Sequence, residues 1–140
     1  MRERAAVAIR TKHRVLVVDV DRPSAEAICA QMFELGHDAR PARSGLSALS
    51  IVEAFKPDIV LVDVGVADIT AYEVARRLRA ANDRRYLVAI AEGSHLTDWI
   101  RALAAGFDRH LTKPLDGTKL RALVSSYGGK QNLRDGSARH

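Results

Sequence analysis

The strongest constraint on the fold is a short apolar run that ends in an acid, the sequence PDIVLVD at residues 57–63. A run this short and this continuously apolar is typical of a central parallel strand that helices cover on both faces. Open α/β folds place their chemistry at the carboxyl ends of the strands, so Asp63 is predicted to lie at a functional edge. Asp also caps helices and closes turns, and position alone leaves that structural role equally open.

The rest of the chain alternates between apolar runs and helical patterns. Further strands are predicted at residues 15–18, 38–42, 86–90 and 107–112. The second of these contains Pro41, which cannot donate to a ladder and therefore indicates a sheet edge. Strands that alternate with helices form right-handed βαβ units with a parallel sheet between two helical layers. The predicted fold is α/β and flavodoxin-like, a doubly wound (βα)5 unit whose five parallel strands follow the order 2-1-3-4-5.

Capping residues and apolar spacing predict where the helices begin and which faces are buried. Ser24, after Pro23, is the expected cap of the first helix, and Ser44-Gly45 opens the second. In the fourth helix, between Ser94 and Gly106, the stripe Leu96, Ile100 and Leu103 is expected to face inward. Asp116 is expected to cap the last helix. The predicted organisation is a basic arm at 1–13, one domain at 14–126 and a flexible tail at 127–140.

The bulk properties are those of a single globular domain. The chain has 140 residues, of which 47% are hydrophobic and 28% charged. A single cysteine, Cys29, excludes an intrachain disulfide, and neither a signal peptide nor a membrane span is recognisable, so a cytoplasmic location is expected. The net charge of +5 is concentrated in the arm. Without interleaved aromatic residues or a DNA-binding motif, nucleic acid is not an expected partner.

The predicted strand order brings three charged residues to one edge of the sheet. Asp19 and Asp63 end neighbouring strands at the switch point, and Lys113 ends the fifth strand. Paired carboxylates can hold Mg²⁺, and an ammonium can pair with a carboxylate or with a phosphoryl group. Phosphoryl transfer needs such neutralisation, and a carboxylate that accepts the group becomes an acyl phosphate.

Four motifs together resemble the receiver domain of two-component response regulators, with its CheY-like fold, over residues 14–126. They are VLVVD at 15–19, PDIVLVD at 57–63, YEVARRLR at 72–79, and AGFD at 105–108 leading to the Lys-Pro pair at 113–114. The resemblance implies that Asp63 is the phosphoacceptor and that Asp19 is a metal-binding acid. It also implies that the Gly65 carbonyl completes the Mg²⁺ site. Lys113 matches the lysine that pairs with the acceptor, and a cis bond to Pro114 is common in the family.

The chain departs from the family pattern at several positions. The second metal-binding acid is replaced by Val20, and the hydroxyl-bearing residue at the end of the fourth strand is replaced by Ala91. The switch aromatic is replaced by His110, which is either a partial or pH-sensitive switch or a half-exposed strand residue. Ala67 and Ala71 stand where the acceptor loop has Pro and Gly.

These departures predict an atypical receiver. Loss of a carboxylate at Val20 should weaken Mg²⁺ binding, with Asp21 a candidate substitute ligand. Ala91 has no hydroxyl to reach a phosphoryl oxygen, so the usual switch should be impaired.

Three functional hypotheses remain open. The first is a stand-alone phosphorelay receiver that accepts a phosphoryl group from a histidine kinase or phosphotransferase and signals to a downstream protein by contact. The second is a pseudo-receiver, a protein-interaction module independent of phosphorylation, and the third, ranked well behind, is a transcription regulator acting through the basic arm. The resemblance also implies a possible homodimer through the fourth and fifth helices. An enzyme with a separate substrate is not expected, since the chain has no Gly-rich phosphate loop and no nucleophile–base pair.

Overall fold

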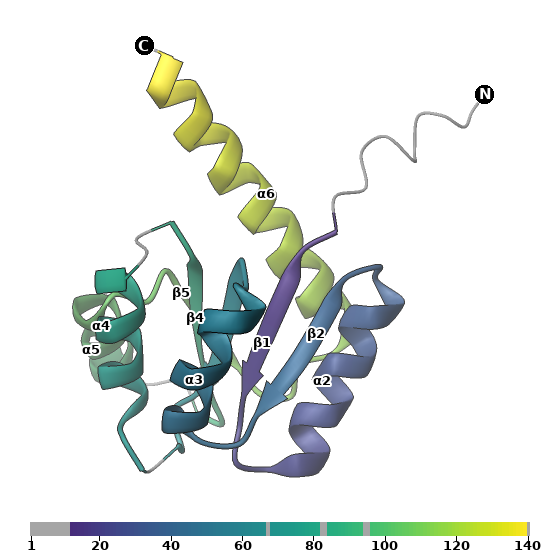
Figure 1. Ribbon diagram of the computed structural model, residues 1–140, viewed down its shortest axis with the longest axis vertical. Coiled ribbons are helices and arrows are strands. Elements are labelled where there is room, and N and C mark those ends of the chain that lie inside the picture. Colours follow the sequence, from purple (N-terminus) through teal and green to yellow (C-terminus); the bar gives the residue numbers. More distant parts are fainter. Residues whose placement is uncertain (1–11, 67, 82–83, 94–95, 140) are drawn as a thin grey trace.

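The computed structural model describes residues 12–66, 68–81, 84–93 and 96–139, with the backbone alone for 96–97 and 129–139. Five strands alternate with five helices in this part of the chain (Figure 1). The elements in order are β1 (Arg14–Val18), α2 (Arg22–Glu34), β2 (Asp38–Ala42), α3 (Gly45–Phe55), β3 (Ile59–Asp63), α4 (Ala71–Ala81), β4 (Tyr86–Ala91), α5 (Leu96–Ala105), β5 (Arg109–Thr112) and α6 (Gly117–Arg139).

The strands form one parallel sheet in the order β2-β1-β3-β4-β5, which confirms the predicted topology. β2, which contains Pro41, is an edge strand as expected. Val18 pairs with Val62 and Asp63 pairs with Ile90, so the ends of β1, β3 and β4 are level. Because β1 and β3 are neighbours, the residues that follow them lie side by side at the same edge.

Two apolar layers cover the sheet because successive strand residues point to opposite faces. One face packs against α3, α4 and α5, and its buried strand residues are Leu16, Val18, Ala42, Val60, Val62, Leu87 and Ala89. The other packs against α2 and α6, and its buried strand residues are Val15, Val17, Ala39, Ile59, Leu61, Tyr86, Val88 and Ile90. Strands that are buried on both faces have continuous apolar sequences, which explains why these strands could be predicted from the sequence.

The start of α2 differs from the prediction. Asp21, and not Ser24, is the N-cap, and its side chain accepts a hydrogen bond from the Ser24 amide. The Ser24 assignment was wrong because the aspartate three residues earlier supplies the oxygen that caps the helix. The two other expected caps are present: Ser44 forms a capping box with Ser47, and Asp116 accepts from the Lys119 amide.

The buried face of α5 also differs from the prediction. Ile100 is 56% exposed and Leu103 is 49% exposed, whereas Ala102 and Ala105 are buried. The sequence carries two apolar stripes on this helix, one residue apart. The stripe of small residues, with Trp99 partly buried beside it, faces the core and lets the helix approach the sheet closely. Ser94, the expected cap, lies outside the described residues.

The last helix is longer than predicted. α6 continues to Arg139, although the composition indicated a flexible tail from residue 127. Tyr127 is buried, and its ring lies 5.6 Å from that of Tyr86 and 4.9 Å from that of His13, so the helix is anchored at the point where it was expected to end. Figure 1 shows α6 extending beyond the sheet, away from the carboxyl ends of β1 and β2. Residues 1–11, most of the predicted basic arm, lie outside the described residues.

No helix within the described part of the chain is long and apolar enough to cross a membrane.

Candidate functional site

Three charged side chains meet at the carboxyl edge of the sheet. The ammonium nitrogen of Lys113 lies 2.7 Å from Oδ2 of Asp63 and 3.0 Å from Oδ2 of Asp19. The three side chains are 17%, 14% and 3% exposed, in that order. One partly buried cation therefore bridges two carboxylates, and the site carries a single net negative charge. The structure thus brings together the three charged residues that the sequence placed at this edge.

Each of these side chains is positioned by a strand end. Asp63 is the last residue of β3, and Asp19 follows β1, where its amide donates to the Ala42 carbonyl. Lys113 follows β5, and its amide donates to the Ala91 carbonyl at the end of β4. The Lys113–Pro114 peptide bond is cis, as the resemblance implied. β4 separates β5 from β3, so it is the long lysine side chain that reaches the acceptor carboxylate.

The ion network keeps Lys113 charged. Burial disfavours the ammonium, but hydrogen bonds to Asp63 and then Asp19 outweigh this effect, so the pKa of Lys113 is raised above its ordinary value. A permanently charged lysine beside the acceptor supplies the electrostatic partner that an arriving phosphoryl group needs.

The second oxygen of Asp63 is held by the loop that follows β3. The amide of Gly65 donates to Oδ1 of Asp63 over 2.6 Å. A Cβ at this position would lie 2.9 Å from the same oxygen, so glycine permits the close approach of the backbone. Gly65 and Lys113 together set the orientation of the acceptor carboxylate, one from each side.

Asp21, the candidate substitute ligand, is occupied elsewhere. Its amide donates to Oδ1 of Asp19 over 2.9 Å, while one of its own carboxylate oxygens accepts the Ser24 amide at the start of α2. Val20, at the position of the missing acid, is 51% exposed. The structure therefore places the backbone of Asp21 against the site and commits its carboxylate to the helix.

The donor set fits Mg²⁺, with one carboxylate fewer than the family pattern. Asp19 and Asp63 supply charged oxygens, the Gly65 carbonyl can supply a neutral one, and Mg²⁺ commonly keeps several waters. Among the described residues, no group of three or more His, Cys, Asp or Glu side chains is close enough to hold a metal ion. Any cation here would thus depend on two carboxylates that Lys113 already neutralises in part.

The two switch positions lie on the face that packs against α5. Ala91 ends β4 and is nearly buried, and His110 pairs with Ala89 across the β4–β5 ladder. The His110 ring lies 5.6 Å from the ring of Trp99, and its Nε2 is buried without a hydrogen-bond partner among the described residues. His110 is therefore a partly buried side chain in contact with α5, and Ala91 offers no side-chain donor beside it.

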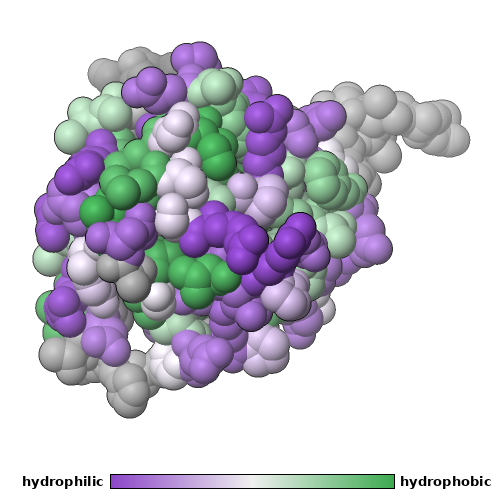
Figure 2. All heavy atoms as spheres, turned by 60° about the horizontal axis from the view of Figure 1, so that its bottom comes forward, coloured by the Kyte–Doolittle hydropathy of each residue, from purple (hydrophilic) through white to green (hydrophobic). Residues whose placement is uncertain are grey.

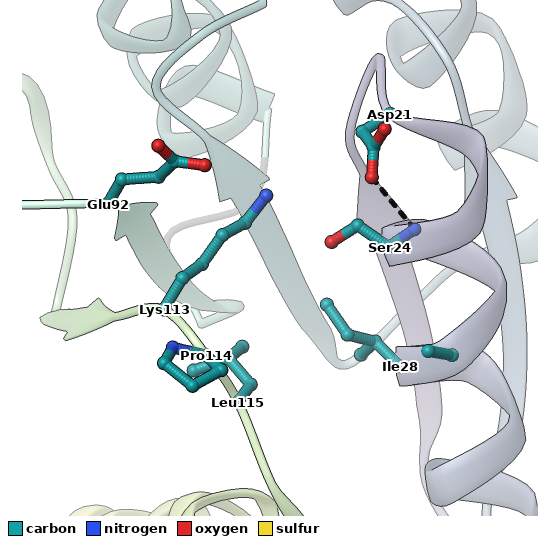
Figure 3. A pocket seen from close by; sticks show the side chains of 8 residues that line it. Asp21, Ser24, Ile28, Glu92, Lys113, Pro114 and Leu115 are labelled. Carbon is teal, nitrogen blue, oxygen red and sulfur yellow. Dashed lines mark hydrogen bonds between the residues drawn. The ribbon is translucent and has the colours of Figure 1, made fainter.

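A pocket of about 500 Å³ opens beside Lys113, between α2 and the loops that follow β4 and β5 (Figure 3). Asp21 lies on the α2 side and Glu92 on the opposite side, next to Lys113, while Ile28 and Leu115 are among the apolar lining residues. Its rim is therefore acidic on two sides, and the lysine that enters it is already paired with carboxylates.

Asp68, in the loop after β3, is a residue that sequence reasoning missed. Its carboxylate accepts the amides of Gly45 and Leu46 at the start of α3. The partners are 23 and 22 residues away, so no local pattern could have indicated the contact. The only sequence signal was an aspartate in a loop, which most often indicates a local turn.

Comparisons with known proteins agree with this geometry. A family model described as the response regulator receiver domain matches residues 15–125. The chain is 28% identical over 125 residues to the response regulator MprA of Mycobacterium ulcerans, a match that covers 89% of this chain and 54% of that protein. The response regulator MprA of Mycobacterium sp. (strain KMS) is 31% identical over 101 residues, which are 72% of this chain and 44% of that protein. The chain thus spans about half the length of these curated relatives.

A solved structure shows the same fold. The response regulator receiver domain protein (CheY-like) from Methanospirillum hungatei JF-1 superposes with a TM-score of 0.81 at 18% sequence identity. The match covers 89% of this chain and 99% of that chain.

Proposed function

The chain belongs to the response-regulator receiver family, and from this premise we propose that Asp63 accepts a phosphoryl group from a histidine kinase or a phosphotransferase. Membership of the family assigns the chain to two-component signalling. The observation that carries the proposal is the orientation of the Asp63 carboxylate, which Lys113 holds at Oδ2 and the Gly65 amide holds at Oδ1. Phosphoryl transfer depends mainly on positioning and charge neutralisation, so an acceptor carboxylate must be held in a defined orientation.

The reaction transfers the group between a histidine of the partner and Asp63. A carboxylate oxygen of Asp63 forms a bond to phosphorus, the bond between phosphorus and the imidazole nitrogen of the donor breaks, and the released imidazole takes a proton from water. The product is an acyl phosphate. Lys113 neutralises the phosphoryl oxygens as it neutralises Asp63 at rest. Mg²⁺, held by Asp19, Asp63 and the Gly65 carbonyl, would supply further charge neutralisation.

The metal site and the switch are proposed to be weaker than is usual in the family. Val20 provides no oxygen, and the Asp21 carboxylate caps α2. Ala91 has no hydroxyl with which to draw the loop after β4 toward a phosphoryl group. We further propose that the domain promotes chemistry only on its own aspartate and acts on no separate substrate.

A second candidate function, a pseudo-receiver that binds a partner without phosphorylation, is supported by the same departures. Lys113 already pairs with both carboxylates, so each has a cationic partner without a metal. Figure 2, which brings the carboxyl edge of the sheet forward, shows hydrophobic residues exposed among the charged ones. Val20 and Leu46, both near this edge, are about half exposed and could contribute to a contact surface.

A homodimer through α5 and α6 is a further proposal. Ile100 and Leu103, on the outer face of α5, are exposed and give this helix an apolar surface that could be covered by a second copy. Light scattering coupled to size exclusion, with Leu103→Glu as the disrupting variant, tests it. A parent that stays monomeric at high concentration contradicts the proposal.

The deciding experiment for phosphorylation is intact mass spectrometry after incubation with acetyl phosphate and Mg²⁺. A phosphoryl adduct on the parent that is absent from Asp63→Asn supports the acceptor assignment. The absence of an adduct on the parent, even at high Mg²⁺, favours the pseudo-receiver. An adduct that persists in Asp63→Asn would contradict the choice of Asp63 as the acceptor.

A further inference from the structure

The loop that follows the acceptor is joined to α3 by two hydrogen bonds. Oδ1 of Asp68 accepts the Gly45 amide and Oδ2 accepts the Leu46 amide, each over 2.8 Å. These two bonds are named here the Asp68–α3 contact. Hydrogen bonds from the Leu46 and Gly45 amides lower the pKa of Asp68, so the carboxylate is charged at neutral pH and its charge complements the positive end of the helix.

The Asp68–α3 contact completes the cap of α3. The first four amides of a helix have no partner within it. In α3 the amides of Ser44 and Ser47 are satisfied by the capping box between these two residues. The remaining two, from Gly45 and Leu46, donate to Asp68. The helix supplies half of its own cap and depends on the loop for the other half.

The packing around Gly45 shows that this junction is close. A Cβ at position 45 would lie 2.6 Å from Cγ1 of Ile69 and 3.0 Å from Cγ2 of Val74. Only glycine lets the start of α3 approach the loop and α4 to this distance. The loop is therefore packed against α3 as well as bonded to it.

The other end of the same loop carries the amide that orients the acceptor. Gly65 donates to Oδ1 of Asp63, and the Val66 amide donates to the Asp63 carbonyl over 3.2 Å. The Val66 side chain is buried. Gly65 and Val66 are thus held at the end of β3, and Asp68, three residues after Gly65, is held at the start of α3.

We propose that Asp68 is a positioning residue, which fixes the β3–α4 loop on α3 and so holds the Gly65 amide against the Asp63 carboxylate. The proposal rests on the function proposed above, because it assigns Asp68 a part in preparing the acceptor. The connection works in both directions, since a coupling between two sites is reciprocal. A change in the position of Gly65 when a phosphoryl group or a cation binds is therefore transmitted to the first turn of α3. This coupling requires neither a hydroxyl at Ala91 nor an aromatic ring at His110.

The test compares Asp68→Asn with a matched control, Ser44→Ala. Asn offers one acceptor oxygen in place of two, and its NH2 group would face a backbone donor, so at least one of the two bonds of the Asp68–α3 contact is lost. Ser44→Ala also removes a cap hydrogen bond from α3, but it leaves the loop untouched. A third variant, Leu46→Pro, removes one donor from the helix side at an exposed position where proline is tolerated.

Two readouts separate positioning from helix stability. The first is the rate of the phosphoryl adduct with acetyl phosphate, which should fall about tenfold in Asp68→Asn, the equivalent of one lost hydrogen bond in the reacting geometry. Leu46→Pro should give a smaller fall in the same direction, and Ser44→Ala should change the rate less than about twofold. The second is the Gly65 amide resonance in a ¹⁵N-resolved NMR spectrum, which should move in Asp68→Asn and Leu46→Pro and stay in place in Ser44→Ala.

An unchanged Gly65 resonance in Asp68→Asn, or an equal loss of rate in Ser44→Ala, would overturn the proposal. If Asp68→Asn does not fold, the Leu46→Pro result decides in the same way. If the parent takes up no phosphoryl group, the proposed function fails by itself, and the Gly65 resonance still decides whether Asp68 positions the loop.

Discussion

Replacing Lys113 by methionine removes the ammonium between Asp19 and Asp63 while keeping an unbranched side chain of similar length. The two carboxylates lose a partner at 3.0 and 2.7 Å and remain 3% and 14% exposed. Breaking a buried ion pair by removing one member costs roughly 3–5 kcal/mol, and the remaining solvent access of Asp63 favours the lower end. We therefore expect Lys113→Met to lower the free energy of unfolding by about 3 kcal/mol at neutral pH.

Urea unfolding followed by circular dichroism measures this loss. With a slope of about 1.5 kcal/mol per molar urea, the midpoint should fall by about 2 M. Mg²⁺ should stabilise Lys113→Met more than the parent, because the cation then has two carboxylates without a competing ammonium. A second variant, Lys113→Met with Asp63→Asn, should recover a large part of the loss, since it carries one carboxylate in place of two.

Two results would refute this reasoning. A loss below about 1 kcal/mol would mean that solvent screens the site as it screens exposed surface pairs. A loss of the same size in the Asp63→Asn background would mean that Lys113 stabilises the protein through Asp19 or through packing and not by neutralising the acceptor.

Three further predictions concern single side chains. Burial, with a contribution from the charge of Glu26, raises the pKa of Cys29 to about 11. Its thiol should therefore react with Ellman's reagent far more slowly in the folded protein than in the urea-unfolded protein. Equal reaction rates would contradict the burial of Cys29. Burial also lowers the pKa of His13 below 6.5 against the opposing effect of Asp58, so the folded state resists its protonation. Its stabilising contribution is present above about pH 6.5 and is lost on acidification, and the urea midpoint of His13→Gln should depend less on pH between about 7 and 5 than that of the parent. Val20→Asp restores a carboxylate and should raise Mg²⁺ affinity about tenfold, or about 1.4 kcal/mol, in isothermal titration; an unchanged affinity would show that position 20 does not face the cation.

The sequence predicted the strands better than the helix surfaces. β2 was predicted with its observed bounds, and the strand before Asp63 was recognised from its apolar run alone. α5 shows where this approach fails. Its two apolar stripes carry similar periodic signals, and the choice between Leu103 and Ala102 depends on how closely the helix approaches the sheet, which no local pattern encodes.

In the candidate site, too, some residues were predicted from the sequence and the roles of others were not. Asp63 is the last residue of a strand, and Asp19 and Lys113 each directly follow one, so strand order was enough to bring them to one edge. The role of Asp21 depended on whether its carboxylate faced the site or the start of α2, and short-range hydrogen bonding to Ser24 decided it. The sequence analysis assigned the cap to Ser24 and considered Asp21 only as a ligand, so the capping role of Asp21 was not predicted.

What the sequence determined by itself follows from short-range order: apolar runs define strands, their alternation with helices defines a parallel sheet, and the sheet order places the acids and the lysine at one edge. What only the tertiary structure decided are contacts between residues distant along the chain. The bonds from Gly45 and Leu46 to Asp68 span more than twenty residues, and the His13–Tyr127 ring contact joins the start of the domain to its last helix. Such contacts form only when packed elements bring the groups within hydrogen-bond or van der Waals distance, so they have no periodic signature in the sequence.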